Sequence, residues 1–174
     1  MARFVTGSTG IVVTVPESEL IVADLRDRFD PAARYGVPAH ITVLFPWLPV
    51  DAVDGAARRA LGELAATTPA WDAELTSVGR FPGVGWLAPS PSVPFVALTR
   101  AVWRRWPETP PYQGRFPEPV PHLTVADGHP DEVLDAVAAE LAPGLPIRFR
   151  VLSLVLLGFD GARWTSLDRF PLLT

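Results

Sequence analysis

His40-Ile-Thr-Val43 is repeated as His122-Leu-Thr-Val125, and these two blocks contain two of the three histidines in the chain. In an extended strand, successive side chains point to opposite faces. The histidine and the threonine of each block therefore share one face, and the two apolar residues share the other. Each block predicts a strand that has one face in the core and presents an imidazole beside a hydroxyl on the other. The repetition indicates a site built from paired histidines.

The same order of elements surrounds each block: a helix, the motif strand, another helix and then extended segments. Segments with the helical spacing of apolar residues alternate with short β-branched runs. This order predicts an α+β chain of two pseudo-symmetric halves whose motif strands meet near the centre. We expect strands over residues 11–15, 40–45, 71–78, 86–88 and 122–126, helices over 17–29, 51–66, 99–106 and 131–141, a turn over 79–85, a loop over 89–92, and a closing hairpin of 147–158 with 164–171.

Length and composition fit a protein with one core. The 174 residues, of which 48% are hydrophobic, predict a single bilobed domain over residues 1–174. The first residues lack the apolar stretch of a signal peptide, and no segment has the length of a transmembrane helix. We therefore expect a cytoplasmic, monomeric protein without a membrane partner.

Charge and residue usage exclude several classes of function. The formal net charge of −4 disfavours an extended nucleic-acid surface, which binds through many phosphates. A small anionic ligand stays compatible, because one pocket needs only a few donors. The chain has no cysteine, and its fifteen basic residues are all arginine. This usage excludes disulfides, thiolate zinc sites, cysteine and lysine nucleophiles, and a P-loop lysine.

Two imidazoles on facing strands suit the chemistry of a phosphodiester. Histidine has an unperturbed pKa near 6.5, so one ring accepts a proton while a second donates one. Cleavage or transfer at phosphorus needs both events, on opposite sides of the reacting atom. Hydroxyl groups beside the imidazoles would donate hydrogen bonds to the non-bridging oxygens, where negative charge must be stabilised. No third ligand for a zinc ion accompanies the two blocks.

The two blocks, 82 residues apart in a chain of this size, resemble the paired signatures of the 2H phosphoesterase superfamily, in its branch of 2′-5′ RNA ligase-like proteins and RNA 2′,3′-cyclic phosphodiesterases. The resemblance implies a bilobed α+β fold with antiparallel sheets lining a central cleft and helices on the outside. It implies a small nucleotide or RNA-end phosphodiester as substrate and no metal or other cofactor. His40 and His122 would be the catalytic acid/base pair, and Thr42 and Thr124 would bind the phosphate.

A long proline-rich segment, residues 107–121, precedes the second block, and loops of this length are often functional. Tyr112 in this segment and Phe45 after the first block are candidates for contact with a nucleobase. Members that act on RNA ends often carry a basic residue just after the second motif, whereas this chain has Asp127. Arg115 or Arg80 would then supply the positive charge, since a guanidinium suits bidentate phosphate contact.

A second reading keeps the cleft but not the turnover. Asp127 and the acidic balance of the chain are compatible with a nucleotide- or phosphate-binding module of the same shape. A third class, acyl- or lipid-modifying enzymes, lacks its Gly-x-Ser-x-Gly signature in this sequence. The remaining histidine, His129, has no repeated context and is interpreted as part of a surface turn or a helix cap.

Overall fold

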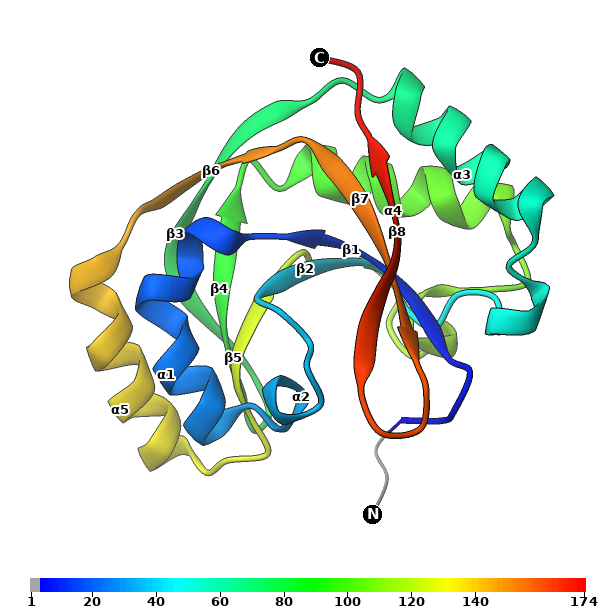
Figure 1. Cartoon of the computed structure of the whole chain (residues 1–174). Helices are drawn as coiled ribbons and strands as arrows, with labels where there is room; N and C mark the ends of the chain where they lie inside the picture. Colours follow the sequence, from blue (N-terminus) through cyan, green and yellow to red (C-terminus); the bar gives the residue numbers. More distant parts are fainter. Residues whose placement is uncertain (1–3) are drawn as a thin grey trace.

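The computed structural model describes residues 4–174, in which eight strands form two four-stranded antiparallel sheets (Figure 1). The first sheet has the order β2-β1-β7-β8 and the second has the order β5-β4-β3-β6. The strands of the first sheet are β1 (Thr9–Thr14), β2 (His40–Leu44), β7 (Ser153–Phe159) and β8 (Trp164–Pro171). Those of the second are β3 (Trp71–Phe81), β4 (Val84–Ser90), β5 (Leu123–Asp127) and β6 (Ile147–Val151). The predicted α+β class with two antiparallel sheets is confirmed.

Five α-helices and four short 3-10 helices connect these strands. The α-helices are α1 (Glu19–Phe29), α2 (Pro31–Arg34), α3 (Gly55–Thr67), α4 (Val93–Arg105) and α5 (Asp131–Leu141). The 3-10 helices are η1 (Pro16–Ser18), η2 (Val50–Ala52), η3 (Pro111–Gly114) and η4 (Ala142–Gly144). None of the helices within the described part of the chain is long and apolar enough to cross a membrane.

The two halves match element by element. The unit β1-α1-β2 corresponds to β4-α4-β5, and each unit ends in a strand that carries a motif block. Both motif strands are edge strands, β2 of the first sheet and β5 of the second, and the two contact each other in the middle of the molecule (Figure 1). The expectation that the motif strands meet near the centre is confirmed.

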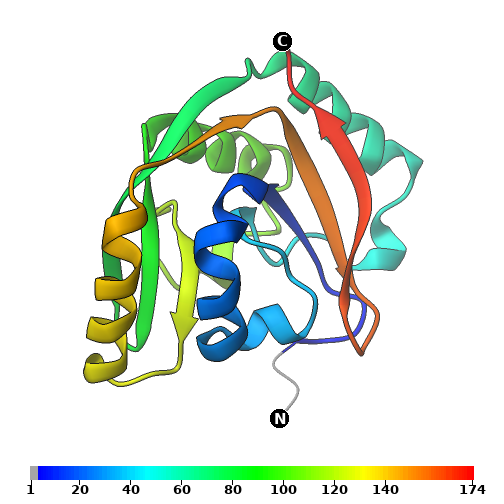
Figure 2. The same ribbon diagram turned by 60° about the vertical axis from the view of Figure 1, so that its left-hand side comes forward.

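Each half supplies the helix that covers the motif strand of the other half. α1 packs against β5, and α4 packs against β2. α1 and α5 contact each other, and Figure 2 shows both on the outside of the molecule with β5 between them in this view. The apolar members of the two blocks, Ile41, Val43, Leu123 and Val125, are buried in one core cluster that spans both sheets. Their burial stabilises the fold and leaves the imidazole and hydroxyl face of each strand directed away from the helices.

Both motif strands carry a register irregularity at the same place. Thr42 and Leu44 face consecutive residues of β1, so Val43 is an extra residue. In β5, Thr124 and Ala126 face consecutive residues of β4, so Val125 is the extra one. A bulge of this kind bends a strand and re-aims the side chains near it. The shared position shows that the pseudo-symmetry extends to the backbone next to each threonine.

Two sequence predictions are wrong in detail. The stretch 147–158 is not one strand of a hairpin: β6 pairs with β3 in the second sheet, and only β7 forms the hairpin with β8. The change of sheet follows the burial pattern, which alternates along the edge strand β6 and is almost continuous along the central strand β7.

The second error concerns the turn predicted over 79–85 and the loop over 89–92. β3 continues to Phe81, β4 runs from Val84 to Ser90, and the turn is confined to Pro82-Gly83. Gly79 marks a close approach within the strand, because a Cβ atom there would lie 2.4 Å from the ring of Trp86. The glycine therefore admits a large aromatic ring and does not start a turn.

Candidate active site

The two motif histidines are held in the same way. Nδ1 of His40 lies 2.7 Å from the carbonyl oxygen of Pro38, and Nδ1 of His122 lies 2.7 Å from that of Val120. A carbonyl oxygen only accepts hydrogen bonds, so each Nδ1 carries the proton and donates it. In the neutral ring, Nε2 then has a free lone pair and can accept a proton. The structure thus gives both imidazoles the same tautomer.

Burial keeps both rings neutral in the free protein. It lowers the pKa of His40 from 6.5 to about 4; the hydrogen bond to Pro38 opposes this effect, and the positive charges of Arg26 and of His122 add to it. Burial also lowers the pKa of His122, against the hydrogen bond to Val120. The effect of His122 on the pKa of His40 indicates that the two imidazoles lie within electrostatic range of each other. A phosphate placed between them would favour their protonated forms by its opposite charge.

The hydroxyls of the two blocks lie beside their imidazoles. Thr42 and Thr124 are half-buried and sit two residues along each strand from the histidines. Thr42 also forms a hydrogen bond with the phenol of Tyr112, whose pKa burial raises and this bond lowers. Thr124 has a different neighbour, since it pairs with Trp86 on β4. The two halves of the candidate site therefore have matching imidazoles and hydroxyls, but different residues surround them.

Aromatic rings form the wall on the second half. Phe81 meets the ring of His122 edge to face at a centroid distance of 5.1 Å, and Trp86 lies 5.8 Å away. Such contacts fix the plane of an imidazole and exclude water from one side of it. The sequence did not indicate this role for either residue. Gly79 makes room for the ring of Trp86, and this glycine was the one sequence feature that could have indicated this packing.

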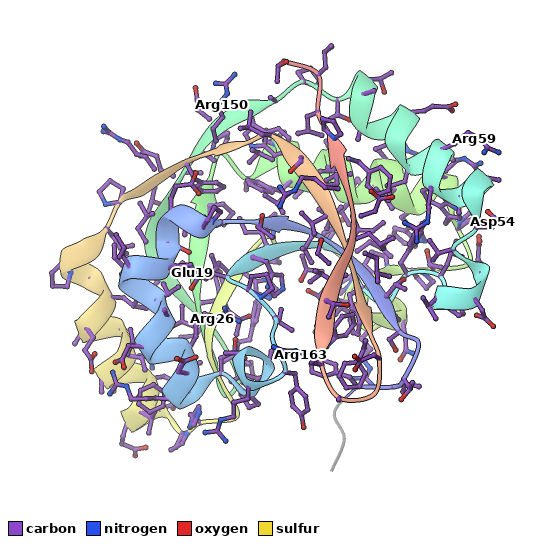
Figure 3. The ribbon with its side chains drawn as sticks, in the orientation of Figure 1. Glu19, Arg26, Asp54, Arg59, Arg150 and Arg163 are labelled. Carbon is purple, nitrogen blue, oxygen red and sulfur yellow. The ribbon has the colours of Figure 1, made fainter. Side chains whose placement is uncertain are left out.

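On the first half, helix α1 holds the loop that carries His40. Arg26 donates to the carbonyl oxygen of Val37 at 2.9 Å, and the backbone N–H of Ala39 donates to Glu19 at 3.0 Å. Figure 3 labels both side chains on α1, on the side of the helix that faces this loop. The two contacts flank Pro38, whose carbonyl orients His40. Arg26 and Glu19 are distant in sequence from the residues that they contact. Composition and motif spacing therefore did not indicate these contacts.

We expect Arg26→Met to lower the free energy of unfolding by about 3–5 kcal/mol, because its buried partner Asp30 would keep an uncompensated charge. Arg26 and Asp30 are each 4% exposed and form an ion pair of 3.0 Å. The matched control is the double variant Arg26→Met/Asp30→Asn, in which no buried charge is left and the cap on the N–H of Ala32 is retained. Urea unfolding measures both. A double variant as unstable as the single one would contradict the charge explanation.

Three of the other predicted contact residues gather at the end of β2 that is opposite to His40. Phe45, Tyr112 and Arg115 line one hollow at the end of β2. Arg80 does not join them, because its guanidinium pairs with Asp135 on α5. Asp127 ends β5, five residues and roughly 16 Å of extended chain from His122. The acid that follows the second motif is therefore at the opposite end of the strand from the imidazole.

The third histidine has a structural role. Nε2 of His129 lies 2.8 Å from the carbonyl oxygen of Phe29, and the two rings meet edge to face at 5.4 Å. The contact ties the end of α1 to the segment before α5. The residue that precedes α5 is Pro130, and no side chain caps that helix, so the expected helix-cap role is wrong. Within residues 4–174, no group of three histidine, aspartate or glutamate side chains is arranged to hold a metal ion.

Comparisons with known proteins identify the family and the fold. The family model described as the 2′-5′ RNA ligase superfamily matches residues 14–163. A search of curated proteins found no match. Among solved structures, E. coli LigT complexed with 3′-AMP has a TM-score of 0.64 at 20% identity, with 97% of this chain and 99% of that chain covered.

Two further structures have the same fold. TT0787 of Thermus thermophilus has a TM-score of 0.60 at 19% identity and covers 95% of this chain and 97% of its own. Usb1 of Kluyveromyces marxianus has a TM-score of 0.51 at 14% identity and covers 96% and 99%. At these identities the likeness shows the fold alone, whereas the family match extends over most of the sequence. The chain belongs to the 2′-5′ RNA ligase superfamily, within the 2H phosphoesterases.

Proposed function

We propose that the protein is a metal-independent phosphodiesterase that acts on 2′,3′-cyclic or 2′-5′-linked nucleotide phosphodiesters. Membership of the 2H phosphoesterases supports a phosphodiesterase-type enzyme. The observation that carries the finer proposal is the matched pair of imidazoles at the start of two contacting edge strands, each with Nδ1 bonded to a carbonyl oxygen. The proposed setting is a monomeric, single-domain protein in the cytoplasm.

The proposed reaction needs one neutral and one protonated imidazole. One Nε2 accepts a proton from the attacking water as its oxygen bonds to phosphorus. The other histidine donates its proton to the ribose oxygen as the bond between that oxygen and phosphorus breaks. The two rings thereby exchange protonation states, and a nucleoside monophosphate is released. Thr42 and Thr124 would donate hydrogen bonds to the non-bridging oxygens as charge develops on them.

The test is hydrolysis of adenosine 2′,3′-cyclic phosphate and of a 2′-5′-linked diadenosine in the presence of EDTA, with products separated by chromatography. We expect release of adenosine monophosphate from at least one of them. Turnover that EDTA abolishes would reject the metal-independent mechanism. Binding of these nucleotides without product would favour the alternative, a nucleotide-binding module with the same cleft.

The pH dependence follows from the lowered pKa of each histidine. The free enzyme reacts only with one proton on the pair, and this form becomes scarce as pH rises above the two pKa values. We therefore expect a bell-shaped profile of kcat/KM with its maximum on the acidic side of 6.5 and a steady fall from there to pH 8. A maximum at pH 7.5 or above would contradict the burial of the pair.

Folding must be monitored in the same experiment. The unfolded chain binds a proton at each histidine near pH 6.5, whereas folded His40 does so only near 4. The contribution of His40 therefore destabilises the fold as pH falls from about 6.5 towards 4. Circular dichroism at each pH separates this loss of folded protein from the titration of the site.

A further inference from the structure

A hollow of about 600 Å³ lies at the end of β2, between the segment 4–8, the residues that follow β2 and the loop at η3. Five aromatic residues line it: Phe4, Phe45, Trp47, Tyr112 and Phe116. Phe116 is 63% exposed, although it is a large apolar residue. The volume falls within the range of small-molecule sites, and exposed aromatic rings suit the face of a nucleobase.

Tyr112 links this hollow to the catalytic pair. Its ring lines the hollow, while its phenol forms a hydrogen bond with Thr42 of the first motif. Its backbone N–H donates to the carbonyl oxygen of Phe45 at 2.7 Å. Tyr112 and Gln113 both have left-handed backbones, with φ of 50° and 57°, a conformation that persists only where surrounding contacts impose it. The side chain of Tyr112 therefore connects the hollow to the hydroxyl of Thr42.

The charge at the rim fits a phosphate. Arg115 lines the hollow and is exposed, and within residues 4–174 no carboxylate forms an ion pair with it. A second hollow of about 580 Å³ on the other sheet lacks this property. Its side chains Glu74 and Arg148 pair with each other, and its Asp72 pairs with Arg150. A free guanidinium beside aromatic rings is the combination that recognises a nucleotide.

We propose that the hollow at the end of β2 is a nucleoside subsite whose Arg115 binds a second phosphate. The proposal rests on the proposed function and narrows its substrate class. The substrate would carry a phosphate in addition to the reacting phosphodiester, as a 5′-phosphorylated nucleoside 2′,3′-cyclic phosphate or an RNA end does. The base and sugar would lie against Tyr112 and Phe116 while the phosphodiester lies between the imidazoles.

The test compares adenosine 2′,3′-cyclic phosphate with and without a 5′-phosphate. We expect kcat/KM of the unmodified protein to be about tenfold higher for the 5′-phosphorylated compound, the size of one charge-assisted contact. Arg115→Gln should remove this preference, so that kcat/KM becomes the same for the two compounds. The matched control is Arg59→Gln, an exposed arginine on α3 that Figure 3 labels on the opposite side of the molecule from α1, and it should keep the preference. Phe116→Ala should lower kcat/KM for both compounds by about tenfold.

Equal kcat/KM for the two compounds, or a preference that survives Arg115→Gln, would overturn the subsite and leave the phosphodiesterase proposal intact. Turnover of neither compound would reject the proposed function instead. In that case calorimetry with adenosine 3′,5′-bisphosphate and 3′-AMP decides on the subsite alone. About tenfold tighter binding of the bisphosphate that is lost in Arg115→Gln supports it, and equal affinities reject it.

Discussion

His40→Gln and His122→Gln should each lower kcat for hydrolysis of a cyclic phosphodiester by about 10²–10⁴, the usual contribution of a general acid or base. The amide of glutamine still fills the site and donates a hydrogen bond, but it does not exchange protons near neutral pH. Single-turnover release of the nucleoside monophosphate measures the chemical step. His129→Gln is the matched control, because His129 lies outside both motif strands and its ring bonds to the carbonyl oxygen of Phe29.

The double variant His40→Gln/His122→Gln adds a test of joint action. Two groups that serve one reaction give strongly non-additive losses, so we expect the double variant to be far less impaired than the product of the two single losses. Independent, multiplying losses would contradict action on one phosphorus. Activity of either single variant close to that of the unmodified protein would remove that histidine from the catalytic pair.

Thr42→Val and Thr124→Val should each lower kcat/KM by about 10²-fold, because a hydrogen-bond donor to a developing negative charge is lost. Valine has nearly the shape of threonine and the same preference for strands, so we expect both variants to fold. The matched control is Thr165→Val on β8, whose side chain is exposed. Steady-state rates at saturating and at limiting substrate give kcat and kcat/KM separately. A loss of transition-state stabilisation should lower kcat.

Thr42 has a second partner, and a further variant separates the two effects. Tyr112→Phe removes the phenol hydroxyl that bonds to Thr42 and leaves the threonine in place. We expect a smaller loss than for Thr42→Val, since the donor to the phosphate is kept. A Thr42→Val variant with unchanged kcat/KM would show that this hydroxyl serves the strand and not the phosphate.

Local periodicity was sufficient for much of the fold. The helix predicted over 131–141 coincides with α5, the strand predicted over 40–45 ends one residue after β2, and the strand predicted over 122–126 is shifted by one residue from β5. Apolar residues recur with a clear period in each of these segments, so the local sequence is enough to predict the element. The border between β6 and β7 lacks such a signal, because a chain that changes sheet at Leu152 remains extended on both sides.

Only the part of the candidate site that the two repeated blocks contribute was predictable from the sequence. The two blocks are alike in sequence; His40 is the first residue of β2 and His122 immediately precedes β5, and these two strands contact each other. The groups that support them differ between the halves: Arg26 and Glu19 on one side, Phe81 and Trp86 on the other. These contacts depend on tertiary packing between segments far apart in the chain, and a single sequence carries no record of such pairs.

The most direct test of the central claim is a crystal structure of the protein with 3′-AMP bound. The two-imidazole mechanism predicts that Nε2 of His40 and Nε2 of His122 both lie within about 2.7–3.2 Å of oxygens of one phosphate, on opposite sides of its phosphorus. A phosphate that contacts only one of these nitrogens, or that binds elsewhere while both stay free, would contradict it.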